Sequence, residues 1–74
     1  RYQVVSLSAL QPFGEGATVD IPALVERGLI SRRGGPVKLL ANGDAPQKVK
    51  IIVNGASASA RRKIEEAGGS VEIV

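Results

Sequence analysis

The architecture of this chain follows from residues 47–74, which have the sequence QKVKIIVNGASASARRKIEEAGGSVEIV. Apolar and mostly basic positions alternate in its first part, as they do in a strand that buries one face. One face is expected to hold Val49, Ile51 and Val53, and the other Lys48, Lys50 and Ile52. We therefore predict a strand from Gln47 to Val53, which Asn54-Gly55 interrupts.

A helix is predicted after this strand, over about residues 58–67. Ser57 stands where a capping side chain is needed, and small or apolar residues recur at spacings of three and four, as Ala56, Ala60, Ile64 and Ala67. Gly68-Gly69 end the helix, and an extended apolar pattern resumes at residues 71–74. A crossover of this length normally joins two parallel strands through a right-handed connection.

The first part of the chain carries shorter signals. Tyr2 to Val5 predicts an opening strand, residues 8–11 one helical turn, and Val37 to Leu40 another strand. Between the helical turn and the second of these strands, Asp20 as a cap and Gly28 as a terminator predict a short helix of about two turns. Together the elements predict a single α/β domain over residues 1–74, a small three- to four-stranded sheet with a C-terminal parallel strand-helix-strand unit and a short N-terminal helix.

Length and composition limit the class of protein. A chain of 74 residues buries roughly 60% of its extended surface, so its core is marginal, while 43% hydrophobic and 23% charged residues are typical of a folded domain. The sequence has no cysteine for disulfides and no apolar run near the ~20 residues that cross a bilayer. Because the chain begins at Arg1, we expect it to be a piece of a longer protein. We expect that protein in the cytoplasm or in an organelle of bacterial descent.

The basic residues are concentrated in the middle of the chain. Eight of the ten Lys and Arg residues lie between residues 31 and 63, where Asp44 is the one acidic residue, although the net charge of the chain is only +3. If this segment folds onto one side of the molecule, it presents a surface suited to a polyanion. The alternative is a solvated basic face that keeps the protein soluble.

Catalysis is not expected. The sequence has no histidine and no cysteine to serve as a general base or a thiol nucleophile near neutral pH. Its carboxylates are scattered, and no glycine-rich phosphate loop or serine elbow is present. We therefore predict no catalytic residue, no metal site, no cofactor and no small-molecule substrate.

The opening of the last helix is the most informative motif. Three bases, Arg61 to Lys63, precede two acids, Glu65 and Glu66, which is the reverse of the order that the helix dipole favours. A phosphate docked at the helix start would justify this order, with Ser57 and Ser59 as further donors. The alternative is that Ser57 only caps the helix and the bases are solvated.

A second candidate contact is the loop at Arg32-Arg33-Gly34-Gly35, although an ordinary surface turn has the same composition. Tyr2 and Phe13 are the only aromatic residues, so stacking platforms for single strands are missing and contacts with phosphates are expected instead. The candidate RNA-binding residues are Arg32, Arg33, Lys38, Lys48, Lys50, Ser57, Ser59, Arg61, Arg62 and Lys63.

Several motifs occur in a familiar order. They are Tyr2-Gln3-Val4-Val5, Val19-Asp20 with Leu24, Gly28-Leu29-Ile30, Pro36-Val37-Lys38-Leu39-Leu40-Ala41-Asn42-Gly43, Ser57-Ala58-Ser59-Ala60 and Ile64-Glu65-Glu66-Ala67-Gly68-Gly69. In this order and at these separations, the chain resembles the C-terminal globular domain of the bacterial-type family of large-subunit ribosomal protein fifteen. The resemblance covers essentially all 74 residues.

The resemblance implies a compact α/β domain that docks on large-subunit ribosomal RNA, beside neighbouring ribosomal proteins, as a structural constituent of the ribosome in the cytoplasm. It also implies a long Gly- and Arg-rich extension ahead of this domain, which we expect to be absent from residues 1–74. Asn54-Gly55-Ala56 replaces the aromatic or histidine-bearing stretch usual in the family. The alternative function is a protein-interaction module that docks through a sheet edge or an apolar face.

Overall fold

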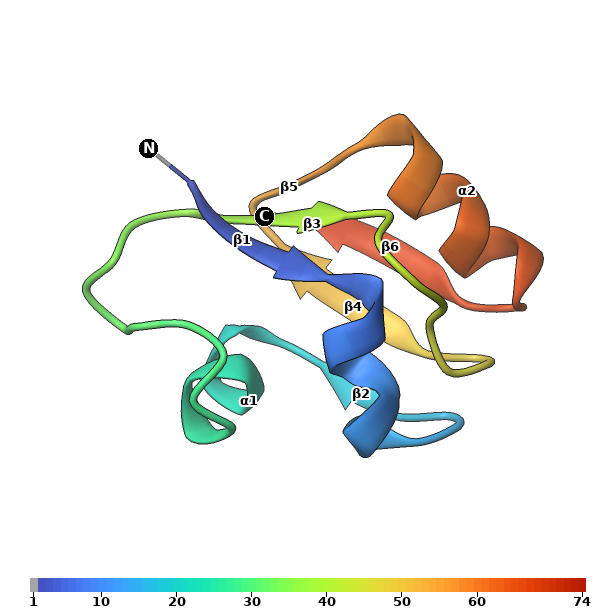
Figure 1. Cartoon of the computed structure of the whole chain (residues 1–74), viewed down its shortest axis with the longest axis horizontal. Coiled ribbons are helices and arrows are strands. Elements are labelled where there is room, and N and C mark those ends of the chain that lie inside the picture. Colours follow the sequence, from blue (N-terminus) through green and yellow to red (C-terminus); the bar gives the residue numbers. More distant parts are fainter. Residues whose placement is uncertain (1) are drawn as a thin grey trace.

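The computed structural model describes residues 2–74. Within this range the strands form two small parallel sheets (Figure 1). One sheet has the order β1-β3-β5 and the other the order β2-β4-β6. The strands are β1 (Gln3–Ser6), β2 (Thr18–Val19), β3 (Val37–Leu40), β4 (Lys50–Val53), β5 (Gly55–Ala56) and β6 (Ser70–Ile73). The predicted α/β class is confirmed, but the strands are divided between two sheets instead of lying in one.

Three helical segments accompany the sheets: the 3-10 helix η1 (Leu7–Phe13), α1 (Ile21–Glu26) and α2 (Ala58–Glu66). The predicted short N-terminal helix is confirmed as α1, where the Asp20 carboxylate accepts a hydrogen bond from the Ala23 N–H at 2.9 Å. The predicted turn at residues 8–11 is part of a longer segment, because η1 continues through Pro12 and buries Leu7 and Leu10.

A single hydrophobic core joins the two sheets. Alternate residues of the strands are buried in it, and η1, α1 and α2 cover it with side chains such as Leu10, Leu24 and Ile64. The strand residues in the core are Val5, Val19, Val37, Leu39, Ile51 and Val53. The two sheets therefore share one core.

The C-terminal strand-helix-strand unit is confirmed. β4 and β6 pair in parallel, with Lys50 opposite Ser70 and Val53 opposite Ile73. The buried face of β4 is the predicted one, and α2 packs on the core through Ala60 and Ile64. In Figure 1, α2 lies above β6, which returns antiparallel to the helix.

The predicted strand from Gln47 to Val53 is shorter in the structure and begins at Lys50. Gln47 and Lys48 form a turn, and Lys48 has a left-handed backbone with φ of 59°. The Lys48 N–H donates to the carbonyl of Ala67 at 2.9 Å. The turn therefore ties the start of this segment to the end of α2 instead of extending the ladder.

Asn54 is the corner at which the chain passes from one sheet to the other. Its side-chain oxygen accepts from the Val37 N–H at 2.8 Å, and its side-chain amide donates to the carbonyl of Val74 at 3.4 Å. The predicted break at Asn54-Gly55 is thus confined to Asn54, because Gly55 already belongs to the short strand β5, which pairs with β3. This crossing of the chain explains why two sheets form.

Candidate nucleic-acid interface

The start of α2 is capped as predicted. The Ser57 hydroxyl oxygen accepts a hydrogen bond from the Ala60 N–H at 3.1 Å, and the Ser57 N–H donates to the carbonyl of Leu39. A hydroxyl that accepts still has a hydrogen to donate, so the cap does not prevent a contact with a phosphate. Ser59 is exposed in the first turn of the helix.

Replacing Ser57 with alanine is expected to lower the free energy of unfolding by about 1 kcal/mol, because the Ala60 N–H loses its partner. Urea denaturation followed by circular dichroism measures the change. Ser59→Ala is the matched control and is expected to shift stability by less than about 0.5 kcal/mol, because Ser59 is exposed. Equal losses in the two variants would show that the Ser57 cap does not stabilise α2.

The basic side chains of α2 are exposed, but they do not share the same contacts. Lys63 donates from Nζ to the carbonyl of Gly43 at 3.2 Å, which holds it against the loop between β3 and β4. Arg61 and Arg62 lie one turn before Glu65 and Glu66, yet the one ion pair within residues 2–74 is Lys50 with Glu72, at 3.8 Å. Both guanidinium groups therefore keep their charge available.

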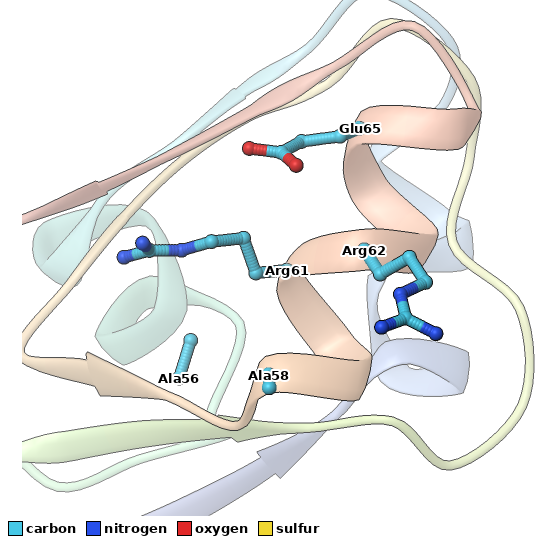
Figure 2. Close-up of a pocket in the computed structure, with 5 residues that line it drawn as sticks. All are labelled: Ala56, Ala58, Arg61, Arg62 and Glu65. Carbon is cyan, nitrogen blue, oxygen red and sulfur yellow. The ribbon is translucent and has the colours of Figure 1, made fainter.

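An open hollow of about 420 Å³ lies beside the first turns of α2. It is bordered by Ala56, Ala58, Arg61, Arg62 and Glu65 (Figure 2). Arg61 and Glu65 extend from the same side of the helix, whereas the guanidinium of Arg62 turns the other way (Figure 2). In the sequence, Glu65 stood out only as one of the two acids that follow the three bases of this helix.

Arg32 and Arg33 are exposed in the loop between α1 and β3. The side chain of Gln3 anchors this loop: its amide donates to the carbonyls of Ser31 and Gly35 at 2.8 and 3.1 Å, and its oxygen accepts from the Ser31 N–H at 2.7 Å. The loop and α2 lie toward opposite ends of the longest axis of the molecule (Figure 1), which measures 31 Å.

The remaining candidates lie on the two sheets or, for Lys48, in the turn that precedes β4. Lys38 is half-buried, with its ammonium 5.7 Å from the centroid of the Tyr2 ring. Lys50 pairs with Glu72 on the second sheet, and Lys48 lies beside the end of α2. The basic candidates are therefore spread over both sheets and toward both ends of the longest axis (Figure 1), and their shared surface stays a prediction.

No helix within residues 2–74 is long and apolar enough to cross a membrane. The same residues contain no group of three or more acidic, histidine or cysteine side chains that would suit a metal ion. The fold and the exposed cations define the class as a small basic α/β domain.

Comparison with known proteins gives the family. A model of the ribosomal protein family that includes 50S-L15 and 50S-L18e matches residues 4–72. The large ribosomal subunit protein uL15 of Coprothermobacter proteolyticus is 44% identical over 74 residues, which are 100% of this chain and 50% of that protein. The uL15 of Micrococcus luteus is 50% identical over 73 residues, 97% of this chain and 48% of that protein.

The uL15 of Lactobacillus delbrueckii subsp. bulgaricus is 42% identical over the whole chain, which corresponds to 51% of that protein. The chain therefore belongs to the ribosomal protein family that includes 50S-L15, and the resemblance found in the sequence is confirmed. The chain spans about half the length of the curated relatives that it matches.

Proposed function

We propose that the domain is a structural part of the large ribosomal subunit that binds ribosomal RNA through phosphate contacts. Its relatives are named as proteins of the large ribosomal subunit. The proposed role has no catalytic step. The observation that carries the RNA proposal is the pair Arg61 and Arg62, which are exposed and form no ion pair within residues 2–74. Cytoplasmic ribosomes are the proposed location.

The proposed contacts fall into two groups. One is the loop with Arg32 and Arg33, and the other is the start of α2 with Ser57, Ser59, Arg61, Arg62 and Lys63. Because these groups lie toward opposite ends of the molecule (Figure 1), we expect them to bind different stretches of a folded RNA. Further proposed phosphate contacts are Lys38 and Lys50 on the sheets and Lys48 in the turn before β4.

The test is a titration of the domain with transcribed large-subunit ribosomal RNA at rising salt. Replacing Arg61 and Arg62 together with alanine is expected to weaken binding and to reduce the slope of log affinity against log salt by roughly 0.7–0.9 for each lost phosphate contact. The slope is the informative measurement, because it counts the released counterions.

Arg27→Gln is the matched control. Arg27 lies outside the two groups, with its guanidinium 4.9 Å from the centroid of the Phe13 ring and donating to the carbonyl of Pro12 at 3.4 Å. It is expected to leave the salt slope unchanged. An affinity that does not depend on salt, or an affinity and salt slope that are unchanged by the loss of both Arg61 and Arg62, would contradict the proposal.

A second candidate function is docking on neighbouring ribosomal proteins. The specific observation is apolar exposure at two edge strands: Val4 of β1 is 54% exposed and Ile73 of β6 is 43% exposed. Unpaired edges of this kind can add a strand from a partner. Tight binding to a protein that survives high salt and ignores the basic residues would favour this function over the first.

A further inference from the structure

The hollow beside α2 has opposite charges on its rim that do not neutralise each other. Arg61 and Glu65 are four residues apart on the helix, a spacing at which side chains normally meet. Within residues 2–74, however, no ion pair joins them. Figure 2 shows the two side chains extending in the same direction with their charged ends apart. The guanidinium of Arg61 and the carboxylate of Glu65 therefore face the same space, and their donors and acceptors are not used on each other.

Two of the residues that line the hollow are small and apolar. Ala56 of β5 and Ala58 at the start of α2 contribute methyl groups, and the short strand holds Ala56 in place by pairing with Leu39. The volume of about 420 Å³ lies within the range of roughly 300–1,000 Å³ that is typical of small-molecule sites. A flat group of modest size can therefore lie over the two alanines between the charged side chains.

The carboxylate restricts what can occupy this space. Two like charges about 4 Å apart repel by about 1 kcal/mol even in water, so Glu65 opposes a bare phosphate there. A carboxylate is an acceptor only, so it needs a neighbouring N–H or O–H donor. The hollow thus suits a ligand that combines a negative group, an apolar flat body and a hydrogen-bond donor.

We propose that the hollow holds one unpaired nucleotide of the bound RNA. Arg61 binds its phosphate, its sugar or base lies over Ala56 and Ala58, and Glu65 accepts a hydrogen bond from it. The donor is either the ribose 2′-hydroxyl or an N–H of the base, since both present the same chemistry to a carboxylate. This inference rests on the proposed RNA-binding function. It adds a contact that recognises a hydrogen-bond donor of the nucleotide as well as its charge.

The proposal gives Glu65 an effect opposite in sign to that of an ordinary acidic residue near RNA. Glu65→Ala is expected to weaken binding to large-subunit ribosomal RNA about tenfold, and Glu65→Gln several-fold, because a charge-assisted hydrogen bond is about twice as strong as a neutral one. Glu66→Gln is the matched control: Glu66 has the same charge, is exposed on the same helix and does not border the hollow. It is expected to leave binding unchanged or to strengthen it slightly.

The salt dependence of the affinity distinguishes the loss of a hydrogen bond from the loss of a phosphate contact. The Glu65 variants are expected to keep the salt slope of the wild type, whereas Arg61→Ala reduces it by roughly 0.7. Thermal unfolding checks that each variant is folded. Single-stranded RNA and DNA of one sequence then identify the donor: a loss confined to RNA assigns it to the 2′-hydroxyl, and a loss with both assigns it to the base.

The outcomes distinguish this proposal from the function on which it rests. Salt-dependent binding by the wild type, together with Glu65 variants that bind as well as or better than it, would overturn the nucleotide proposal and leave the RNA-binding function standing. Absent or salt-independent binding by the wild type would overturn both.

Discussion

Replacement of Ile64 by alanine is expected to lower the free energy of unfolding by about 2–5 kcal/mol. Ile64 is fully buried and is one of two residues by which α2 packs on the core. Its loss leaves a cavity beneath the helix that carries Arg61 and Arg62. A domain of this size is stable by only a few kcal/mol, so this change removes a large part of its stability.

Thermal unfolding checks this result, with an expected fall in Tm of roughly 4–8 °C for each kcal/mol lost. Ile73→Ala removes the same atoms from a residue that is 43% exposed and is expected to cost about 1 kcal/mol or less. RNA affinity should fall with Ile64→Ala at temperatures where α2 detaches. A Tm equal to that of the Ile73 variant would show that α2 does not depend on this anchor.

Replacement of Gly69 by alanine is expected to cost about 3 kcal/mol. A Cβ at this position would collide with the carbonyl oxygen of Val49 and lie 3.0 Å from its nitrogen, and both are backbone atoms. The next residue, Ser70, donates its N–H to that same carbonyl at 3.0 Å. The added methyl group therefore pushes the start of β6 away from β4.

Gly16→Ala is the control for glycine substitution itself. Gly16 has a φ of +78°, and a Cβ added there would meet no neighbouring atom within 4 Å. The expected cost is therefore about 1–2 kcal/mol, from backbone strain alone. Denaturant unfolding of both variants measures the difference. A Gly69 variant as stable as the wild type would mean that β6 shifts without loss of its pairing.

The sequence was most predictive where one side-chain pattern dominates a segment. The alternation around Ile51, the cap at Ser57 and the apolar spacing over residues 56–67 predicted β4, α2 and their parallel return strand, because each of these patterns lies within one segment of the chain. The cap at Asp20 predicted α1 for the same reason.

The elements that were missed depend on distant partners. Thr18–Val19 and Gly55–Ala56 are too short to show a periodicity, and each becomes a strand only because β4 or β3 lies beside it. The left-handed backbone at Lys48 also has no sequence signal, since lysine rarely adopts it.

For the candidate interface, the sequence indicated which charged residues are exposed but not how they are laid out. Charge along the chain identified Arg61 and Arg62, and both are exposed. The sequence could not show that Arg32 and Arg33 lie toward the other end of the molecule (Figure 1), nor that Ala56 borders a hollow with Glu65. The order of bases before acids in α2 predicted a phosphate at the helix start, and it gave no sign that Glu65 borders a hollow beside β5.

The strand pairings have a consequence for how the domain forms during protein synthesis. Each of them joins segments far apart in the chain: Gln3 with Val37, Thr18 with Lys50, and Lys50 with Ser70. Such non-local contacts make folding slow, because long loops must close before any ladder is gained. A nascent chain that has not yet added residues 70–73 exposes one side of β4 without a partner, and this is the stage at which mispairing between neighbouring chains is easiest.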